Sequence, residues 1–344
     1  MKRFFGWLSF LVVIACLGVG GAVYLLERSF VSEPFGQGTR VVNVPTGATA
    51  RSLAKMLADA KVVSDERDLY WHLRLFRRGF HPKHGEYEFV GPQKPDDVLG
   101  KIAHGDVKLY RFTAAEGLRA DEMAKVIGQT GICEAAEFLR IARDPESPKK
   151  YGVPGPTLEG YLFPSTYSVP RGAGCGGIVQ TMVGHFKQAW AQAQPHRLPE
   201  VKLDEQKATT LASIIEKETG QAAERPRISC VFHNRLKKGM RLGTDPTVVY
   251  AILVDNDFKW SGNIHKSDLS RPSPYNTYLV KGLPPGPISN PGQLALNAAL
   301  SPAQCTDYYF VSRNDHTHVF CPDLKCHEAN VRKWQIEFFR RRKG

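Results

Sequence analysis

The sequence lacks both a second long apolar run and the composition of a disordered chain. After residues 4–26, no other stretch reaches the roughly 20 apolar residues that a helix needs to cross a membrane. The sequence therefore excludes a multi-pass membrane protein. Because 42% of the 344 residues are hydrophobic and only 23% are charged, the chain can bury a sizeable core. We expect two or three folded domains at this length.

The single apolar run, residues 4–26, follows the basic residues Lys2 and Arg3. It is longer than the roughly 7–15 residues typical of a cleavable signal, and no A-x-A cleavage site follows it. Because the positive charges precede the run, residues 1–3 are predicted to stay in the cytoplasm while the rest is exported. The sequence therefore predicts a single-pass anchor in a bacterial inner membrane, with the folded part in the periplasm. A cleaved signal and a lipoprotein processed at Cys16 are the alternatives.

Acidic residues are fewer than basic ones, with 34 Asp and Glu against 46 Lys and Arg and a net charge of +12. A basic balance fits a nucleic acid, an anionic membrane surface or an acidic polymer as partner. Export makes nucleic acid an unsuitable partner for the folded part. We therefore predict no nucleic-acid binding.

Six of the seven cysteines lie outside the apolar run, and an even number in an oxidising compartment is typical of disulfides. These six are Cys133, Cys175, Cys230, Cys305, Cys321 and Cys326. Fifteen pairings are open, and the sequence does not choose among them. His316 and His318 lie near Cys321 and Cys326, which suggests zinc, but no second paired set completes a standard site. We favour a Cys321–Cys326 disulfide and predict no metal.

A strand–turn–helix pattern occurs twice in the N-terminal part of the chain. In each copy a short strand precedes a glycine turn and a helix, and Gly47 and Ala50 of the first copy match Gly117 and Ala120 of the second. Modules of this type suit a binding domain. A generic α+β spacer is the alternative.

One carboxyl group takes a position that normally holds an apolar side chain. Leu211, Ile214, Ile215 and Glu218 are spaced i, i+3, i+4 and i+7, which places them on one face of a helix. Glu218 therefore continues the apolar stripe, and Glu216 is predicted to point well away from it. A carboxyl group that faces a core or a cleft is costly unless it is protonated or paired.

Two effects are expected to raise the pKa of Glu218. Gly220 is predicted to end the helix, so Glu218 lies in the last turn, where the helix dipole disfavours a carboxylate. Burial acts in the same direction. A raised pKa is what a general acid needs near neutral pH. The alternative is a core glutamate that pairs with Arg225 or Arg235.

Residues 242–290 are rich in Pro, Gly, Asn and Tyr and are predicted to be surface loops, which often carry binding residues. Aromatic faces combined with Asn, Asp and Thr commonly hold sugar polymers. The candidate binding residues are Glu159, Thr244, Asp245, Tyr275, Asn276 and Thr277. Solvated loops without a ligand are the alternative, and Glu224 is interpreted as structural.

Eight blocks of the sequence resemble the YceG-like family, the MltG endolytic murein transglycosylases of bacterial inner membranes. They are 159–164 (EGYLFP), 211–219 (LASIIEKET), 224–225 (ER), 232–236 (FHNRL), 239–242 (GMRL), 244–247 (TDPT), 274–278 (PYNTY) and 282–286 (GLPPG). The resemblance covers most of the chain from about residue 40 and includes the N-terminal anchor and a LysM-like module.

The resemblance implies cleavage of the β-1,4 bond between N-acetylmuramic acid and N-acetylglucosamine within peptidoglycan glycan strands. The family cleaves without water, leaves a 1,6-anhydro end, and is thought to terminate growing strands near penicillin-binding protein synthases. Glu218 matches the family's catalytic glutamate, which protonates the glycosidic oxygen and then accepts a proton from the 6-hydroxyl. Most glycosidases use two carboxylates, but one suffices where the substrate supplies its own nucleophile. No cofactor is implied.

These features predict an α+β fold with an N-terminal transmembrane helix, a small LysM-like strand–helix module and a larger mixed α+β catalytic domain. The expected segments are a cytoplasmic tip at 1–3, a transmembrane helix at 4–26, a linker at 27–40, the LysM-like module at 41–108, an intermediate region at 109–200 and a catalytic region at 201–344. The main alternative function is a non-catalytic peptidoglycan-binding scaffold for cell-wall synthases. A metal-dependent periplasmic hydrolase that uses the C-terminal cysteines and histidines is a further one.

Overall fold

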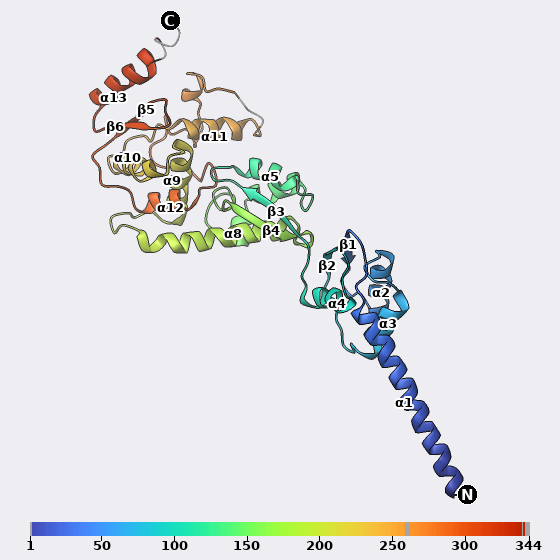
Figure 1. Cartoon of the computed structure of the whole chain (residues 1–344). Coiled ribbons are helices and arrows are strands. Elements are labelled where there is room, and N and C mark those ends of the chain that lie inside the picture. The colour runs from blue at the N-terminus through green and yellow to red at the C-terminus, as the bar shows by residue number, and fades with distance from the viewer. Residues whose placement is uncertain (1, 259–261, 339, 341–344) are drawn as a thin grey trace. The chain divides into compact units, whose positions relative to one another are not determined.

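The structure is a computed structural model that describes residues 2–258, 262–338 and 340 (Figure 1). The chain divides into two compact units. The N-terminal unit consists of Met1–Tyr110 and Val169–Gly172, and the C-terminal unit consists of Arg111–Ser168 and Ala173–Gly344. Both contain helices together with short two-stranded sheets. The chain therefore has the α+β class that the sequence predicts.

In the N-terminal unit, one antiparallel sheet packs against short helices (Figure 1). The elements are α1 (Lys2–Ser32), β1 (Thr39–Val44), α2 (Ala50–Asp59), α3 (Glu66–Leu75), β2 (Gly85–Val90) and α4 (Pro95–His104). β1 pairs with β2 so that Val42 lies opposite Tyr87. Val42, Val44 and Tyr87 are buried with Leu53 of α2 and Leu69 of α3. The unit therefore has a hydrophobic core of its own.

The other elements belong wholly or mostly to the C-terminal unit. The strands and α-helices are β3 (Leu109–Ala114), α5 (Ala120–Gly128), α6 (Ala135–Arg143), α7 (Ser147–Tyr151), β4 (Ser165–Pro170), α8 (Gly174–Ala193), α9 (Glu205–Glu218), α10 (Arg225–Lys237), α11 (Asp245–Asp255), α12 (Gln293–Leu300), β5 (Tyr309–Ser312), β6 (His318–Cys321) and α13 (Leu324–Val331). Short 3₁₀ turns occupy η2 (Gln194–His196), η3 (Ala222–Glu224) and η4 (Asp268–Ser270), and η5 (Arg332–Glu337) is a π-helical segment. A further 3₁₀ turn, η1 (Arg171–Ala173), lies at the boundary and belongs mostly to the N-terminal unit. β3 pairs with β4, and β5 pairs antiparallel with β6. In Figure 1, α9, α10 and α12 lie close together and α8 runs beside them.

The predicted repeat is confirmed as two strand–turn–helix units. β1 leads through a turn into α2, and β3 leads through a turn into α5. The turns contain Gly47 with φ 78° and Gly117 with φ 75°, a left-handed conformation that glycine adopts without steric cost. The matching glycines were therefore a sign of matching backbone geometry.

The segment predicted as a transmembrane helix, residues 4–26, lies within α1, which continues to Ser32 and so into the predicted linker. Within the part of the chain that the structure describes, no helix is both long and apolar enough to cross a membrane. This finding does not support the predicted transmembrane helix. Parts of the predicted tip and of the predicted catalytic region, namely Met1, 259–261, 339 and 341–344, lie outside the described residues.

The prediction that residues 242–290 form loops throughout is wrong, because α11 occupies Asp245–Asp255. Thr244 precedes the helix in an extended conformation, and Pro246 lies in the first turn, where a missing amide hydrogen costs no helical hydrogen bond. Later side chains such as Val248 are buried. The sequence prediction missed this helix because the residues around it are rich in Pro and Gly, although its own apolar residues are buried in the core.

Three disulfides lie in the C-terminal unit: Cys133–Cys175, Cys230–Cys305 and Cys321–Cys326. The first joins the residue before the α6 N-cap to α8, and the second joins α10 to the segment after α12. The third joins β6 to α13 and is the pair that the sequence favours. The structure thus selects one of the fifteen pairings.

We expect the double variant Cys230→Ser/Cys305→Ser to lose about 4 kcal/mol of unfolding free energy, because this bond closes a long loop in the unfolded chain. Its sequence separation is 75 residues, against 5 for Cys321–Cys326. The matched control Cys321→Ser/Cys326→Ser should therefore lose only about 2 kcal/mol. Denaturant titration of both variants measures the difference, and equal losses would contradict the loop-length argument.

Candidate active site

α9 passes through the interior of the C-terminal unit and ends at Glu218. Asp204 caps the N-terminus of this helix by accepting a hydrogen bond from the Lys207 N–H at 2.8 Å. Every residue from Ala208 to Ile215 is buried, and α9 packs against α10, α11 and α12. The helix therefore holds Glu218 on a rigid element, as a precise catalytic group requires.

Glu218 is in the last turn of its helix, as the sequence predicts, but Gly220 does not end that helix. Thr219 has already left the helix in an extended conformation, with φ −145° and ψ 135°. Gly220 is not among the glycines with a left-handed conformation. The carbonyl end of the helix dipole therefore still lies beside Glu218, where it disfavours a carboxylate.

The Glu218 carboxyl group is half-buried, and its pKa lies close to neutral pH. The Thr244 hydroxyl donates a hydrogen bond to its Oε1 atom. Burial is the largest influence and raises the pKa of Glu218 to about 7, and the nearby Asp245 carboxylate also raises it. The Thr244 hydrogen bond, His318 and Arg235 act in the opposite direction. Near neutral pH the group is therefore populated both as an acid and as a carboxylate.

Neither arginine of the alternative interpretation forms an ion pair with Glu218. Arg225 donates to Glu216 at 2.6 Å. Arg235 donates from Nε to a backbone carbonyl oxygen at 2.7 Å and from a second nitrogen to another carbonyl oxygen. Among the described residues Glu218 takes part in no ion pair. The interpretation of Glu218 as half of a core ion pair is therefore wrong.

Glu216, and not Glu218, is the glutamate that forms a buried ion pair with an arginine. Its side chain is only 4% exposed and pairs with Arg225, whose side chain is 7% exposed. A second oxygen of Glu216 accepts the N–H of Gly292 at 2.9 Å, where α12 begins. Arg225 begins α10, so Glu216 connects the N-termini of two helices. The Glu216 side chain therefore points away from the Glu218 site, as the sequence predicts. It points into the protein and not into solvent.

Thr244, Thr247 and Thr277 form a buried cluster that orients the Thr244 hydroxyl. The Thr244 N–H donates to Thr277 Oγ1 at 3.1 Å. Thr247 Oγ1 donates to the Thr244 carbonyl oxygen at 2.7 Å and lies 2.7 Å from Thr277 Oγ1. None of the three is more than 3% exposed. Of the predicted binding residues, Thr244 thus contacts Glu218 directly, and Thr277 supports Thr244.

Three residues of the block 274–278 make different contacts near Thr244 and Asp245. The Tyr278 hydroxyl, which the sequence did not single out, donates to Asp245 Oδ1 at 2.7 Å. Tyr275 packs on Tyr250 with ring centroids 4.9 Å apart. Asn276 is fully buried, and its amide nitrogen donates to two backbone carbonyl oxygens at 2.8 and 3.1 Å. Asn276 therefore holds its loop together and offers no exposed atom to a ligand.

Glu159, predicted as a cleft residue, is 4% exposed. Its two oxygens accept the Ala120 N–H at 3.1 and 3.2 Å, and the Asn290 amide donates to Oε1 at 2.8 Å. Burial raises the pKa of Glu159 to about 8, while the hydrogen bond from Ala120 opposes that rise. Because Ala120 begins α5, Glu159 caps that helix and ties it to the segment that holds Asn290. This geometry makes it part of the scaffold.

His318 was considered only as a zinc ligand in the sequence, yet it lies near Glu218. Its Nδ1 atom is 2.7 Å from Glu224 Oε2, and its N–H donates to Glu224 Oε1 at 2.9 Å. The Thr219 hydroxyl also donates to Glu224, at 3.5 Å. Glu224 therefore links β6 to the residue that follows Glu218. No local pattern indicates this contact, because it joins segments far apart in the sequence.

A cavity of about 220 Å³ adjoins the C-terminal end of α9. It is lined by Arg119, Lys217, Asp245, Pro246, Val249, Tyr250, Leu253 and Ile288. Lys217 immediately precedes Glu218, and Asp245 immediately follows Thr244, so the cavity adjoins the two segments that carry Glu218 and Thr244. Its lining combines cations, a carboxylate and an aromatic ring.

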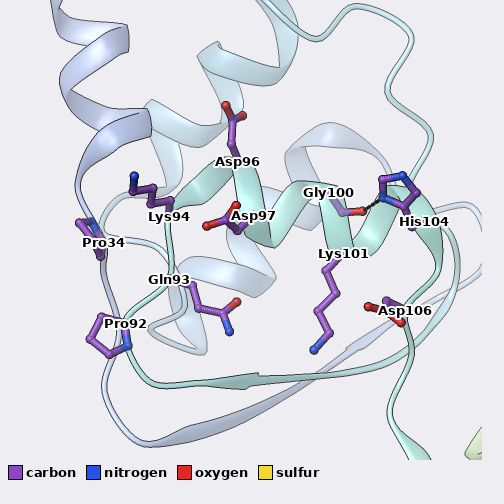
Figure 2. A pocket seen from close by; sticks show the side chains of 10 residues that line it. All are labelled: Pro34, Pro92, Gln93, Lys94, Asp96, Asp97, Gly100, Lys101, His104 and Asp106. Carbon is purple, nitrogen blue, oxygen red and sulfur yellow. Dashed lines mark hydrogen bonds between the residues drawn. The ribbon is translucent and has the colours of Figure 1, made fainter.

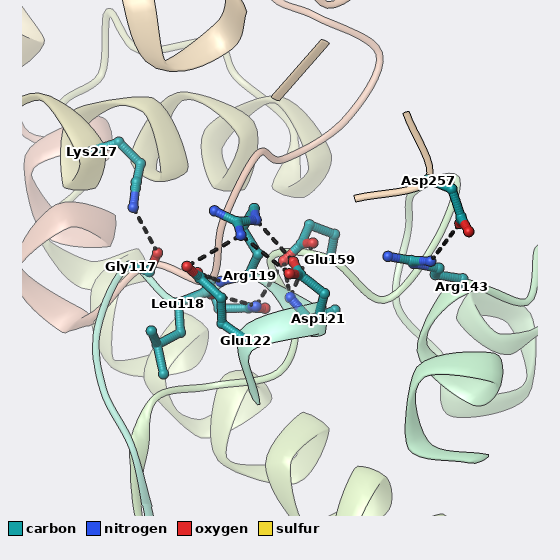
Figure 3. Close-up of polar contacts among 11 residues, drawn as sticks. Gly117, Leu118, Arg119, Asp121, Glu122, Arg143, Glu159, Lys217 and Asp257 are labelled. Atoms are coloured by element: carbon teal, nitrogen blue, oxygen red, sulfur yellow. Dashed lines mark hydrogen bonds and ion pairs between the residues drawn. The ribbon is translucent and has the colours of Figure 1, made fainter. Parts of the chain in front are cut away.

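Two cations of this cavity are held in place by neighbours (Figure 3). Arg119 donates from Nε to Asp121 at 2.8 Å and lies 3.2 Å from Glu122. Lys217 donates to the Gly117 carbonyl oxygen at 3.3 Å. The charge of Arg119 is thus already compensated by carboxylates. Lys217 is held by a neutral carbonyl group, so its charge can face an anionic ligand without the side chain first being ordered.

A second cavity, of about 620 Å³, lies in the N-terminal unit (Figure 2). Its lining is Pro34, Pro92, Gln93, Lys94, Asp96, Asp97, Gly100, Lys101, His104 and Asp106. Apart from the His104 imidazole, none of these described residues offers an aromatic face on which a sugar ring could stack, and His104 is held by the Gly100 carbonyl oxygen at 2.7 Å. We therefore assign no glycan site here.

Three of the four residues considered as zinc ligands have other partners. Cys321 and Cys326 are bonded to each other, and His318 is bound to Glu224. Within the described ranges, no group of three His, Cys, Asp or Glu side chains converges as a metal site would need. The hydrolase alternative therefore loses the ligands on which it depended.

The fold and the site define an α+β protein in which a desolvated carboxyl group, that of Glu218, ends a buried helix and forms no ion pair among the described residues. The chain belongs to the YceG-like family, whose sequence profile matches residues 42–333. This is the family that the sequence blocks indicated.

Named relatives agree with this assignment. The endolytic murein transglycosylase of Bacillus subtilis (strain 168) is 30% identical, over 92% of this chain and 91% of its own length. That of Streptococcus pneumoniae serotype 2 is 25% identical over 94% of this chain, which spans 64% of the relative's length. The crystal structure of a putative yceG-like protein from Listeria monocytogenes has a TM-score of 0.57 and 30% identity, covering 85% of this chain and 98% of its own.

Proposed function

We propose that this protein is a lytic murein transglycosylase that cuts the β-1,4 bond between N-acetylmuramic acid and N-acetylglucosamine within glycan strands. The observation that carries the proposal is Glu218, a desolvated carboxyl group with a pKa of about 7 at the end of a rigid helix. Membership of the YceG-like family and the names of the relatives support the substrate class.

One carboxyl group is sufficient because the sugar supplies its own nucleophile. Protonated Glu218 donates its proton to the glycosidic oxygen while the bond from that oxygen to C1 of N-acetylmuramic acid breaks. The Glu218 carboxylate then accepts the proton of the 6-hydroxyl, whose oxygen bonds to C1. The products are a 1,6-anhydro end and a free 4-hydroxyl on N-acetylglucosamine. Glu218 is protonated again, and no water is consumed.

The neighbours of Glu218 suit this exchange between acid and base. Asp245 and burial favour the protonated form that starts the reaction. The Thr244 hydroxyl, His318 and Arg235 stabilise the carboxylate that forms in the middle of it. Opposing influences of this kind keep the pKa near the working pH, which is where a group that must both donate and accept a proton is most effective.

The adjoining cavity is proposed to hold part of the glycan. Lys217 would face the carboxylate of the muramic acid lactyl group or of a peptide stem. Tyr250 would offer an apolar face to a sugar ring. These contacts would fix which glycosidic oxygen lies within reach of Glu218.

Digestion of purified peptidoglycan by the full chain tests the proposal, with mass spectrometry of the products. We expect 1,6-anhydro ends, which are lighter by one water than the products of hydrolysis. Reducing ends would identify a hydrolase. Binding to peptidoglycan without any new ends would identify the scaffold of the alternative hypothesis.

The rate should fall as the pH rises through about 7, because the first step needs protonated Glu218. Above that pH, kcat/KM is expected to drop about tenfold per pH unit. The matched variant Asp245→Asn removes a charge that raises the pKa of Glu218, so the fall should begin at a lower pH. A turbidity assay from pH 5 to 9 measures both profiles, and a profile that rises through pH 7 would contradict the assigned acid.

We further propose that the folded part acts in the periplasm at the inner membrane and terminates growing strands beside cell-wall synthases. The three disulfides support an oxidising compartment. Membrane fractionation with protease protection tests the location. The length of glycan strands in cells without the protein tests the role, since loss of a terminator lengthens them.

A further inference from the structure

The C-terminal half of α3 and the turn after it leave large apolar side chains in solvent. Trp71 is 57% exposed, Leu75 is 46% exposed and Phe76 is 45% exposed. The opposite face of α3 buries Leu69 and Leu73 in the core of the N-terminal unit. The helix is thus apolar on both sides, and only one side is covered by protein. Such a surface commonly marks a site of interaction.

Arginines surround these apolar side chains. Arg74 and Arg78 are exposed, and neither forms an ion pair among the described residues. Arg77, in the same turn, does pair, with Asp96 at 2.8 Å. Among the described residues, the guanidinium groups of Arg74 and Arg78 are therefore without an anionic partner, and both residues lie in the same helix end and turn as Leu75 and Phe76. A guanidinium group binds phosphate through two parallel hydrogen bonds.

The apolar surface continues from α3 onto α1. A groove of about 300 Å³ is lined by Val23, Phe30, Asp68, Trp71, His72, Leu75 and Phe76, which come from both helices. Phe30 of α1 packs near His72 of α3, with ring centroids 6.2 Å apart. On α1, Tyr24 is 56% exposed and Leu25 is 65% exposed. The exposed apolar area is therefore larger than α3 alone provides.

We propose that this surface, formed by Trp71, Arg74, Leu75, Phe76 and Arg78 and here named the α3 patch, docks on a lipid bilayer with anionic head groups. A helix that lies in a membrane interface combines Trp, Phe and Leu with flanking basic side chains, and the patch has that combination. Tryptophan occupies the head-group level, while arginines approach lipid phosphates. The patch would hold the N-terminal unit against the bilayer independently of glycan cleavage.

The full chain in lipid nanodiscs tests the proposal. Discs are made with anionic phosphatidylglycerol or with neutral phosphatidylcholine, and both carry a quencher near the head group. The fluorescence of the wild type minus that of Trp71→Phe isolates the Trp71 signal. We expect at least twofold quenching in anionic discs and less in neutral discs. The variant Arg74→Gln/Arg78→Gln should remove most of that difference.

Arg77→Gln is the matched control, because Arg77 is already paired with Asp96 and should change the signal little. An absence of Trp71 quenching in either type of disc overturns the proposal. Equal quenching in both types that the double arginine variant leaves unchanged also overturns it. If a protein partner protects Trp71 in place of lipid, the patch belongs to a protein interface. Cleavage of soluble glycan strands should stay unchanged in all patch variants, which separates this outcome from that of the proposed function.

Discussion

Glu218→Gln should lower the rate of glycan cleavage about 10³-fold or more and leave the fold intact. The substitution keeps the shape of the side chain but removes both the proton donor and the carboxylate, and one group performs both steps of the proposed reaction. Because Thr244 donates to Oε1, a glutamine oxygen can keep that hydrogen bond. Release of anhydro products by the variant and the wild type measures the effect. Unchanged activity would remove Glu218 from the mechanism.

The same variant should be more stable than the wild type at pH 8. The pKa of Glu218 is raised in the folded protein to about 7, so its contribution to stability is complete below the unfolded pKa and is lost as the pH rises through 7. Above that range a neutral glutamine avoids a penalty of roughly 3 kcal/mol or less. Thermal unfolding at pH 8 and pH 4 checks this, and the gain should nearly vanish at pH 4.

Glu216→Ala should have the opposite result: little direct effect on chemistry and a loss of about 3 kcal/mol or more of unfolding free energy. Of the carboxylates that the structure describes, the change leaves the 7%-exposed Arg225 with Glu116 alone, at 3.5 Å. It also leaves the Gly292 N–H without its acceptor. A buried charge without its partner is among the most destabilising changes in a protein. Denaturant titration measures the loss.

Two variants make the test specific. Glu218→Ala, two residues away at the same helix end, removes no ion pair among the described residues and should not reproduce the loss. In the double variant Glu216→Ala/Arg225→Met, the second change removes the stranded charge, so the combined loss should be smaller than the sum of the single losses. Strictly additive losses would mean that the pair is not coupled.

The main catalytic candidate could be predicted from the sequence because the argument was local. The spacing of Leu211, Ile214 and Ile215 alone places Glu218 on the buried face of a helix, and the structure confirms that helix. The same local argument correctly separated Glu216 from Glu218. It did not show that Glu216 is buried too, because its partners Arg225 and Gly292 come from other helices.

The supporting residues could be predicted less well, for a related reason. Asn276 and Glu159 are polar residues in turn-rich segments, where sequence patterns indicate exposure. Both are buried because backbone groups from elsewhere satisfy their side chains. His318 reaches the site through Glu224, across a long sequence separation. Contacts of this kind depend on tertiary packing, which a periodic pattern does not encode.

The disulfides have a consequence for biogenesis. Each bonded cysteine is joined to the next bonded cysteine along the chain, in the order Cys133–Cys175, Cys230–Cys305 and Cys321–Cys326. If the folded part enters an oxidising compartment from its N-terminal end, each of the six bonded cysteines meets its native partner before it meets any other of the six. Simple oxidation in order of arrival then yields the native bonds. Secretion should therefore need a thiol oxidant, but no isomerase to reshuffle mispaired intermediates.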